Sequence, residues 1–410
     1  MRPALPAAAR SGEGARAGPP AAGGARALRD PHLRGLVYQT GLVAAVALIG
    51  WYLLSNAAQN LAARAIASGF GFLGREAGFA IGETTLFSYA AADSYLRALG
   101  IGLANTFRVA AIGIVAATLL GTLVGLGRLS RNWIIARLAS IYVEVIRNVP
   151  LLVQLFFWYA MISVNFPGPR DAFKLLPGVF LSNRGIVFPF PQAHPAYNWL
   201  PAALVTGAAL AWLACRWAAR RQARTGAQFP VMSTAIVLLF GVPLFAVLAA
   251  GAPLRLEYPV LGGFNFSGGA VLTPEFAALL AGLVMYTAAF IAEIVRAGVI
   301  SVDRGQVEAA YALGLRRRHA MRLVILPQAL RVVVPPLTSQ YLNLTKNSSL
   351  AVAIGYPDLV SVANTTINQT GQAIEGIAII MLVYLTVSLS ISAFMNAYNR
   401  RVALKGGARA

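Results

Sequence analysis

Few side chains in this 410-residue sequence have types and spacings that could make or break bonds. Each of the three lysines follows a residue other than glycine, so the Gly-Lys pair of a phosphate-binding Walker A loop is absent. His32, His194 and His319 lie too far apart for a His-x-x-x-His metal pair, and no Gly-x-Ser-x-Gly elbow occurs. We therefore expect that the chain is not an enzyme and holds no cofactor or metal. If the protein carries out an energy-requiring process, we expect the energy to come from an ion gradient or from a partner protein.

One segment, residues 301–327, has a spacing that suits contact with another protein. Asp303 with Gln306 three residues later approximates a capping box and predicts the start of a short helix. Gly314 can end this helix, and the basic stretch from Arg316 predicts a second one. The resulting helix–glycine–helix elbow has small residues at its apex, which allow close approach, and arginines that suit an acidic rim. An amphipathic loop lying on a membrane is the alternative that these residues alone leave open.

The elements that position this elbow are predicted to be transmembrane helices. The chain is 58% hydrophobic and 12% charged, with a mean hydropathy of +0.65, whereas a soluble protein has about a quarter of charged residues. Since about 20 apolar residues span a bilayer, we expect an all-α integral membrane protein with about eight spans, at residues 36–56, 99–127, 138–163, 198–216, 231–251, 274–299, 328–350 and 376–397. Pro335 and Pro336 interrupt the seventh span, which predicts a short or broken helix there.

The net charge of +20 could indicate a nucleic-acid-binding protein. Most basic residues, however, recur in every other loop, as the positive-inside rule requires, and this pattern excludes that class. It places both termini and the elbow in the cytoplasm. We expect a disordered basic tail at 1–35, an uncleaved first span at 36–56, a periplasmic loop at 57–98 and a second tail at 401–410.

The elbow resembles the EAA loop of ABC-importer permeases. The resemblance rests on Glu308-Ala309-Ala310, on Gly314 and on Val324-x-Leu326-Pro327, where the family usually has isoleucine in place of the valine. It implies that this loop docks into a cleft of a cytoplasmic ABC ATPase dimer, which would use the ATP and Mg²⁺. The coupling residues would then be Glu308, Ala309, Ala310, Gly314, Val324, Leu326 and Pro327.

Other segments resemble the polar amino-acid permeases of the HisM-like family: Glu144-x-x-Arg147-x-x-Pro150, Asn105-Thr106 with Arg108, residues 292–298 and residues 346–350. The long loop 57–98 and the inserted hairpin 198–251 resemble the larger, Q-type subunits of general L-amino-acid importers. The resemblance implies a type I ABC-importer permease core with extra helices at residues 99–400, in a bacterial inner membrane. It also implies a heterodimer with a second permease subunit, and a periplasmic amino-acid-binding protein.

Several polar residues in or near the spans are candidates for a substrate path, because polar groups at membrane depth are costly and commonly functional. They are Arg147, Gln154, Asn343, Lys346, Asn347 and Ser348. Structural alternatives remain open. Arg147 could pair with Glu144, Glu293 could pair with Arg296 at the end of a helix, and Lys346 could belong to an ion pair that stabilises a gate.

The expected function is alternating-access import of L-amino acids, driven by ATP hydrolysis in a partner. The rival hypothesis is an ion-coupled secondary amino-acid transporter. Such proteins need ionisable residues at midspan and commonly have inverted repeats, whereas this sequence has few midspan acids and no evident repeat. A membrane-embedded enzyme is disfavoured by the scarcity of His, Lys and Asp clusters.

Overall fold

A computed structural model describes residues 31–63, 68–84, 87–192, 194–227, 229–251 and 255–402. Most of the tail predicted at 1–35, and most of that at 401–410, lie outside these residues. The chain forms two units, 1–68 and 69–410. In the first, α2 (Pro31–Ala63) is a continuous helix whose Leu42, Val46 and Trp51 are all more than 60% exposed. A helix that is apolar all round suits a lipid environment.

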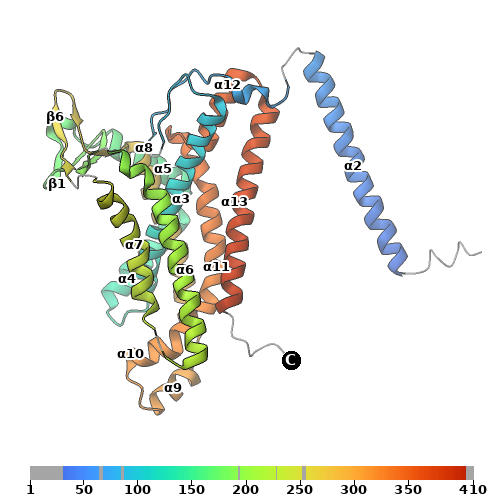
Figure 1. Ribbon diagram of the computed structural model, residues 1–410. Coiled ribbons are helices and arrows are strands. Elements are labelled where there is room, and N and C mark those ends of the chain that lie inside the picture. The colour runs from blue at the N-terminus through green and yellow to red at the C-terminus, as the bar shows by residue number, and fades with distance from the viewer. Residues whose placement is uncertain are drawn as a thin grey trace, which may run out of the picture. The chain divides into compact units, whose positions relative to one another are not determined.

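The second unit is built around α3 (Tyr95–Arg128) and α8 (Pro274–Ile300), which lie side by side (Figure 1). Small residues recur every four positions on the face of α3 that packs against α8, at Gly113, Ala117, Gly121 and Gly125. A Cβ on Gly121 would lie 2.6 Å from the Cβ of Ile291. This close approach of the two backbones is how membrane helices gain packing energy where no hydrophobic effect drives their association.

The span predicted at 138–163 is two helices in the structure. α4 (Trp133–Asn148) and α5 (Leu151–Ser163) meet at an angle of 106°. Pro150 is the cause, because the residue before a proline is disfavoured in helical conformation, and Val149 is extended at φ −98°, ψ 128°. Seven of the described helices are long and apolar enough to cross a membrane, or eight if α4 and α5 form one broken span. The prediction of a mostly helical membrane protein is thus confirmed.

The interruption predicted at Pro335 and Pro336 is wrong. α11 (Leu326–Asn347) runs through both prolines and continues as the 3-10 helix η5 (Ser348–Ile354). Each proline lacks the N–H that would bond the carbonyl four residues back, but the helix is held by packing. Val333 and Val334 are buried, and a Cβ on Gly298 of α8 would lie 2.2 Å from Val333. α12 (Leu359–Thr370) and α13 (Ala373–Val402) complete this part of the unit.

Residues 195–249 form a helical hairpin that begins with the 3-10 helix η3 (Pro195–Trp199). Its helices α6 (Leu200–Thr225) and α7 (Val231–Ala249) pack against each other. A Cβ on Gly207 would lie 2.7 Å from the carbonyl oxygen of Leu238, so glycine permits the contact. Outward-facing side chains such as Val205, Val237 and Phe245 are each more than 60% exposed.

Short strands flank this hairpin in the sequence, and the prediction of an all-α protein missed them. The main sheet is antiparallel with strand order β1-β2-β3-β8, and two further pairs join β4 with β5 and β6 with β7. Their bounds are β1 Phe173–Leu176, β2 Val179–Ser182, β3 Gly185–Phe188, β4 Phe190–Pro191, β5 Leu256–Glu257, β6 Val260–Gly262, β7 Asn265–Ser267 and β8 Ala270–Leu272. A short 3-10 helix, η2 (Pro169–Asp171), precedes β1. In Figure 1 the strands lie at one end of the bundle, which we call the sheet end, and helices α9 and α10 lie at the other.

The described residues of segment 69–94 form a layer on α3 and α12. It begins with the 3-10 helix η1 (Phe70–Gly74), and its Phe72, Ala77 and Ile81 are buried in one cluster with residues of those two helices. The carboxylate of Glu375 accepts a hydrogen bond from the backbone N–H of Gly69, at 2.6 Å. Phe72, Ala77 and Ile81 therefore anchor this segment to the helices.

Candidate functional site

The elbow that the sequence predicts forms as two short helices, α9 (Arg304–Ala312) and α10 (Arg317–Ala320). The Asp303 carboxylate caps α9 by accepting from the Gly305 N–H at 2.7 Å. Gly314 ends the turn at φ +73°, and the N–H groups of Gly314 and Leu315 donate to the carbonyls of Tyr311 and Ala310. This pair of bonds is a Schellman motif. α10 then continues through the π-helix η4 (Met321–Ile325) into α11.

Most of the predicted coupling residues lie on the surface of the elbow. Glu308, Ala309, Gly314, Leu326 and Pro327 are exposed, and Val324 is half-buried. A Cβ added to Gly314 would meet no atom within 4 Å, so the apex of the elbow is open. Ala310 differs, since it is buried, as is Ala320 of α10.

Large apolar side chains beside this apex are exposed. Leu313 is 81% exposed and Tyr311 is 46% exposed. The exposed basic residues Arg316, Arg317, Arg318 and Arg322 follow directly in the chain. An apolar tip with a basic rim is typical of a surface that another protein covers.

Two helix ends near the elbow are joined by an ionic cluster. The Glu293 carboxylate of α8 accepts from Arg296 at 2.5 Å and also from Arg128 at the end of α3. The predicted Glu293–Arg296 pair is thus present, and it also ties α3 to α8. The alternative pair Glu144–Arg147 is not among the ion pairs of the described residues. The guanidinium of Arg147 lies over the ring of Phe290, 4.9 Å from its centre.

The structure separates the predicted substrate-path residues. Gln154 is buried and donates to the carbonyls of Ile146 and Val149 at 2.9 and 3.0 Å, so it closes the bend between α4 and α5. Ser348 is fully buried and bonds to the carbonyl of Thr345. Asn343 is exposed and Asn347 is half-buried. Exposed Lys346 lines a cleft of about 400 Å³ with Ser349 and Tyr384, between α11 and α13.

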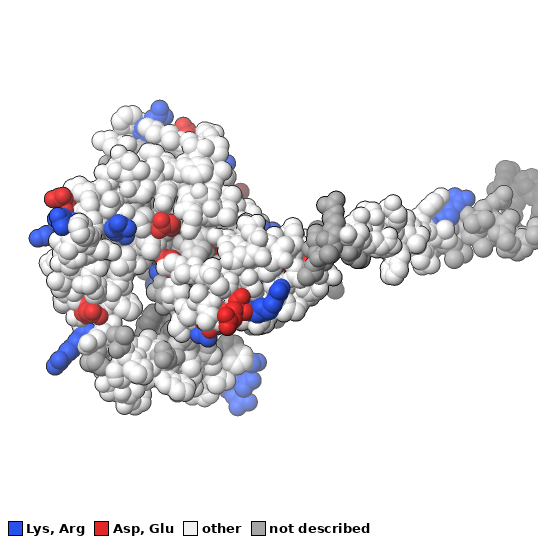
Figure 2. All heavy atoms as spheres, turned by 90° about the horizontal axis from the view of Figure 1, so that it is seen from above, with Lys and Arg blue, Asp and Glu red and all other residues white. Residues whose placement is uncertain are grey.

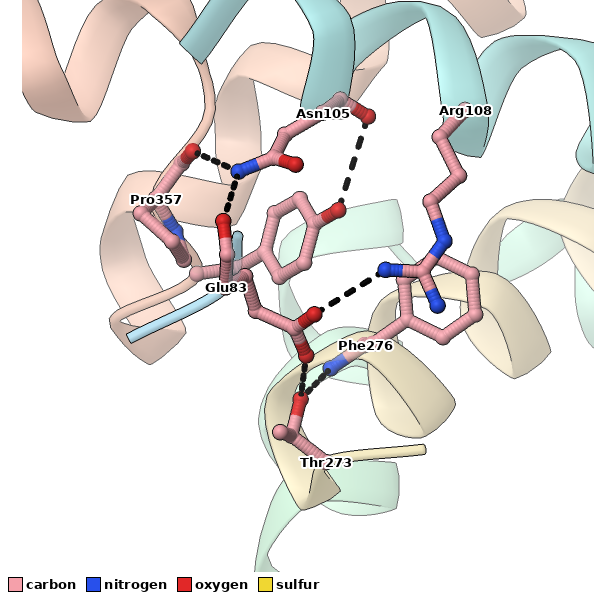
Figure 3. Close-up of polar contacts among 7 residues, drawn as sticks. Glu83, Asn105, Arg108, Thr273, Phe276 and Pro357 are labelled. Atoms are coloured by element: carbon pink, nitrogen blue, oxygen red, sulfur yellow. Dashed lines mark hydrogen bonds and ion pairs between the residues drawn. The ribbon is translucent and has the colours of Figure 1, made fainter. Parts of the chain in front are cut away.

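A buried polar network at the sheet end was not predicted (Figure 3). The Nη1 of Arg108, on α3, lies 2.9 Å from the Oε2 of Glu83, and the guanidinium stacks 4.2 Å above the ring of Phe276. The other carboxylate oxygen of Glu83 accepts from the hydroxyl of Thr273, which itself caps α8 by accepting from Phe276 N–H at 3.2 Å. The signal for this pair was Arg108 itself, because a cation in an apolar span requires a partner.

Asn105 extends the network to the start of α12. Its amide donates to the backbone carbonyls of Glu83 and Pro357, at 2.9 and 3.0 Å (Figure 3). The next residue, Asp358, caps α12 through the Ser361 N–H, and burial raises the pKa of its carboxyl to about 7. Together these contacts join segment 69–84, α3, α8 and α12 at one buried point.

Two clefts open at the sheet end, on either side of the first residues of α8. One, of about 450 Å³, is lined by residues 79–83 and by parts of α12. The other, of about 480 Å³, lies toward the strands. Thr273 and Glu275 line both.

Comparison with known proteins places this architecture among transport components. Residues 214–404 match the family described as binding-protein-dependent transport system inner membrane component. The general L-amino acid transport system permease protein AapQ of Rhizobium johnstonii is 49% identical over 92% of this chain and 94% of its own. The putative amino-acid ABC transporter permease protein YhdX of Escherichia coli is also 49% identical, over 93% and 97%. The glutamate/glutamine/aspartate/asparagine transport system permease protein BztB of Rhodobacter capsulatus is 41% identical over 90% and 92%.

Proposed function

Because the chain belongs to the family of binding-protein-dependent inner-membrane transport components, we propose that it is the permease subunit of an ABC importer that carries L-amino acids across the bacterial inner membrane. Relatives that are 49% identical over nearly the whole chain have amino-acid permease names, and this supports the substrate class. A permease is not itself an enzyme, so hydrolysis of ATP with Mg²⁺ would belong to a separate ATPase dimer.

The observation that carries the proposal is the open apex of the elbow. Glu308, Ala309 and Gly314 lie on a surface that no part of the described chain covers. The Schellman motif at Gly314 and the cap at Asp303 give the elbow a defined shape. Since α10 runs through η4 into α11, a displacement of the elbow is transmitted to a membrane helix.

The residues at the two ends of the helix bundle support one orientation of the chain in the membrane. Basic residues gather in the elbow, and the strands lie at the other end (Figure 1). By the positive-inside rule the elbow, the N-terminal tail and the C-terminal tail face the cytoplasm. A periplasmic amino-acid-binding protein would then meet the sheet end.

A second permease subunit is expected to complete the translocation path. α13 exposes Met381, Leu382 and Leu385 beside the cleft that contains Lys346. A heterodimer is the arrangement we propose, with alternating access produced by rigid-body rocking of helices. In that mechanism the Glu293 cluster and the α3–α8 packing make the core move as one body.

Uptake of a radiolabelled amino acid into vesicles that hold the assembled transporter tests the function. Glu308→Lys and Gly314→Asp should abolish uptake while the protein still inserts. The ion-coupled alternative predicts that both elbow variants keep their uptake. If uptake continues without ATP and follows a proton or sodium gradient, the importer proposal is wrong.

A further inference from the structure

The cleft of about 480 Å³ at the sheet end has a lining that suits a small zwitterion. One basic and one acidic side chain, Arg184 and Glu275, line it together with neutral polar groups. The neutral members include Tyr159, Ser163, Asn183 and Asn265. Its volume is within the range of small-molecule sites in proteins.

The pairing of strands β3 and β8 brings the two charges to the same cleft. Ile186 pairs with Leu272, so the turn that carries Arg184 lies beside the start of α8, which carries Glu275. Gly185 makes this approach possible. It lies at φ +99°, and a Cβ there would be 2.0 Å from the carbonyl oxygen of Leu272.

The two charges do not neutralise each other. Among the described residues no ion pair joins Arg184 and Glu275. Glu275 accepts a 3.3 Å hydrogen bond from the Tyr159 hydroxyl, and Arg184 is exposed. Asn183, which also lines the cleft, has a buried Oδ1 without a hydrogen-bond partner in the described part of the chain.

The neighbouring cleft of about 450 Å³ provides a comparison. It shares Thr273 and Glu275 and adds Glu83, whose carboxylate is paired with Arg108, and none of the described residues that line it is basic. The α-carboxylate of a zwitterion would therefore meet no basic lining residue there. Figure 2 shows that the face seen from above carries scattered acidic and basic side chains, so no single-sign surface field favours either charge.

We propose that the cleft between Arg184 and Glu275 is an outer subsite for a free amino acid, with Arg184 facing the α-carboxylate and Glu275 facing the α-ammonium group. The proposal rests on the import function above and adds a place where the amino acid is held before it enters the membrane. The charged residues of the subsite recognise only the α-carboxylate and the α-ammonium group, which all free amino acids share. The subsite therefore accepts amino acids with different side chains.

A protection experiment tests occupancy of the cleft directly. In the assembled transporter in nanodiscs, without binding protein, Asn265→Cys is introduced together with Cys215→Ser, which removes the single native cysteine. L-Glutamine should slow labelling of this exposed position by a charged methanethiosulfonate. L-Glutamine methyl ester, which lacks the carboxylate, should require a roughly tenfold higher concentration for equal protection, as expected for loss of one charge-assisted contact.

Variants and a parallel uptake assay separate this proposal from the import function. Arg184→Gln should raise the half-protecting concentration about tenfold, whereas Lys174→Gln, on the exposed strand β1, should not change it. If the ester protects as well as L-glutamine, or if Arg184→Gln has no effect, the subsite is wrong even when ATP-driven uptake is intact. Absence of ATP-driven uptake in the wild-type transporter would instead overturn the import function.

Discussion

Glu83 and Arg108 form an ion pair of 2.9 Å that joins a loop residue to the interior of a membrane helix. The two side chains are only 5% and 11% exposed, and each compensates the charge of the other. Thr273 and Phe276 complete the surroundings, and the pair thereby ties segment 69–84 to both α3 and α8.

The first prediction concerns this pair. Glu83→Ala leaves the Arg108 guanidinium buried without its carboxylate, which should cost about 3 kcal/mol of stability. Glu83→Gln keeps an oxygen that can accept from Thr273 and should cost less. Arg97→Gln is the control, because the Arg97–Asp93 pair is half exposed and should contribute less than about 1 kcal/mol. Thermal unfolding of the purified chain in one detergent measures all three, and equal unfolding temperatures for Glu83→Ala and Arg97→Gln would contradict the prediction.

The second prediction concerns the apex of the elbow. Gly314 lies at φ +73° with open space around it, so a side chain there is strained by the backbone and not by a neighbour. Gly314→Ala should therefore destabilise the turn by about 1 kcal/mol, and Gly314→Asn should cost less because asparagine tolerates this conformation. Co-purification of the ATPase and ATP-driven uptake should fall in the same order. Equal behaviour of the two variants would exclude backbone strain as the cause.

The third prediction concerns packing between α3 and α8. Gly121→Ala places a Cβ 2.6 Å from Ile291 and 2.8 Å from the carbonyl oxygen of Ala288, so the helices must separate. Overpacking of this kind costs about 1–3 kcal/mol, more than the gain in helix propensity of about 1 kcal/mol. Gly100→Ala is the matched control on the same helix, since no atom lies within 4 Å of its Cβ. We expect a lower unfolding temperature for the first variant and an unchanged or higher one for the second.

The fourth prediction is a pH dependence caused by Asp358. Burial raises the pKa of its carboxyl to about 7, and its Oδ2 is buried without a hydrogen-bond partner among the described residues. The folded state therefore binds the proton more tightly than the unfolded chain, whose aspartates titrate near 3.9. The contribution of this group to stability is full below pH 4 and is lost as the pH rises toward 7. Asp358→Asn keeps an oxygen that can cap α12 and should remove this component. The difference in unfolding temperature between wild type and variant, measured from pH 5 to pH 8, should favour the variant increasingly as the pH rises.

Local features of the fold were predictable where one residue type carries the physical cause. The cap at Asp303 and the turn at Gly314 follow from the backbone preferences of those residues, and the structure has both. Apolar length likewise predicted α3 and α8. The bend at Val149 had its signal in Pro150, but that signal was outweighed by the continuous apolar run on both sides.

Features that depend on distant partners were not predictable. Strands β3 and β8 are four and three residues long, which is too short for a reliable alternation of apolar and polar residues. About eighty residues also lie between them. Glu83 lies in a loop, and nothing in its neighbourhood indicates that it reaches Arg108. In the elbow, Ala309 and Ala310 look equivalent in sequence, yet one is exposed and the other is buried. A methyl group is compatible with either face, so only the tertiary packing decides which of the two alanines is buried.

The register of β3 and β8 has a consequence for how the chain can be shortened. Phe188 and Ala270 are direct cross-strand partners, so their Cα atoms are only about 5 Å apart. The chain between these two residues, which includes α6 and α7, therefore leaves the main sheet at the end of β3 and returns to it directly beside that end, at the start of β8. A two-residue Asn-Gly turn could close that gap, and the remaining strands would then form an ordinary β-hairpin leading directly into α8. The register of β3 and β8 thus predicts that the helical hairpin is an insertion whose removal would leave the main sheet able to form.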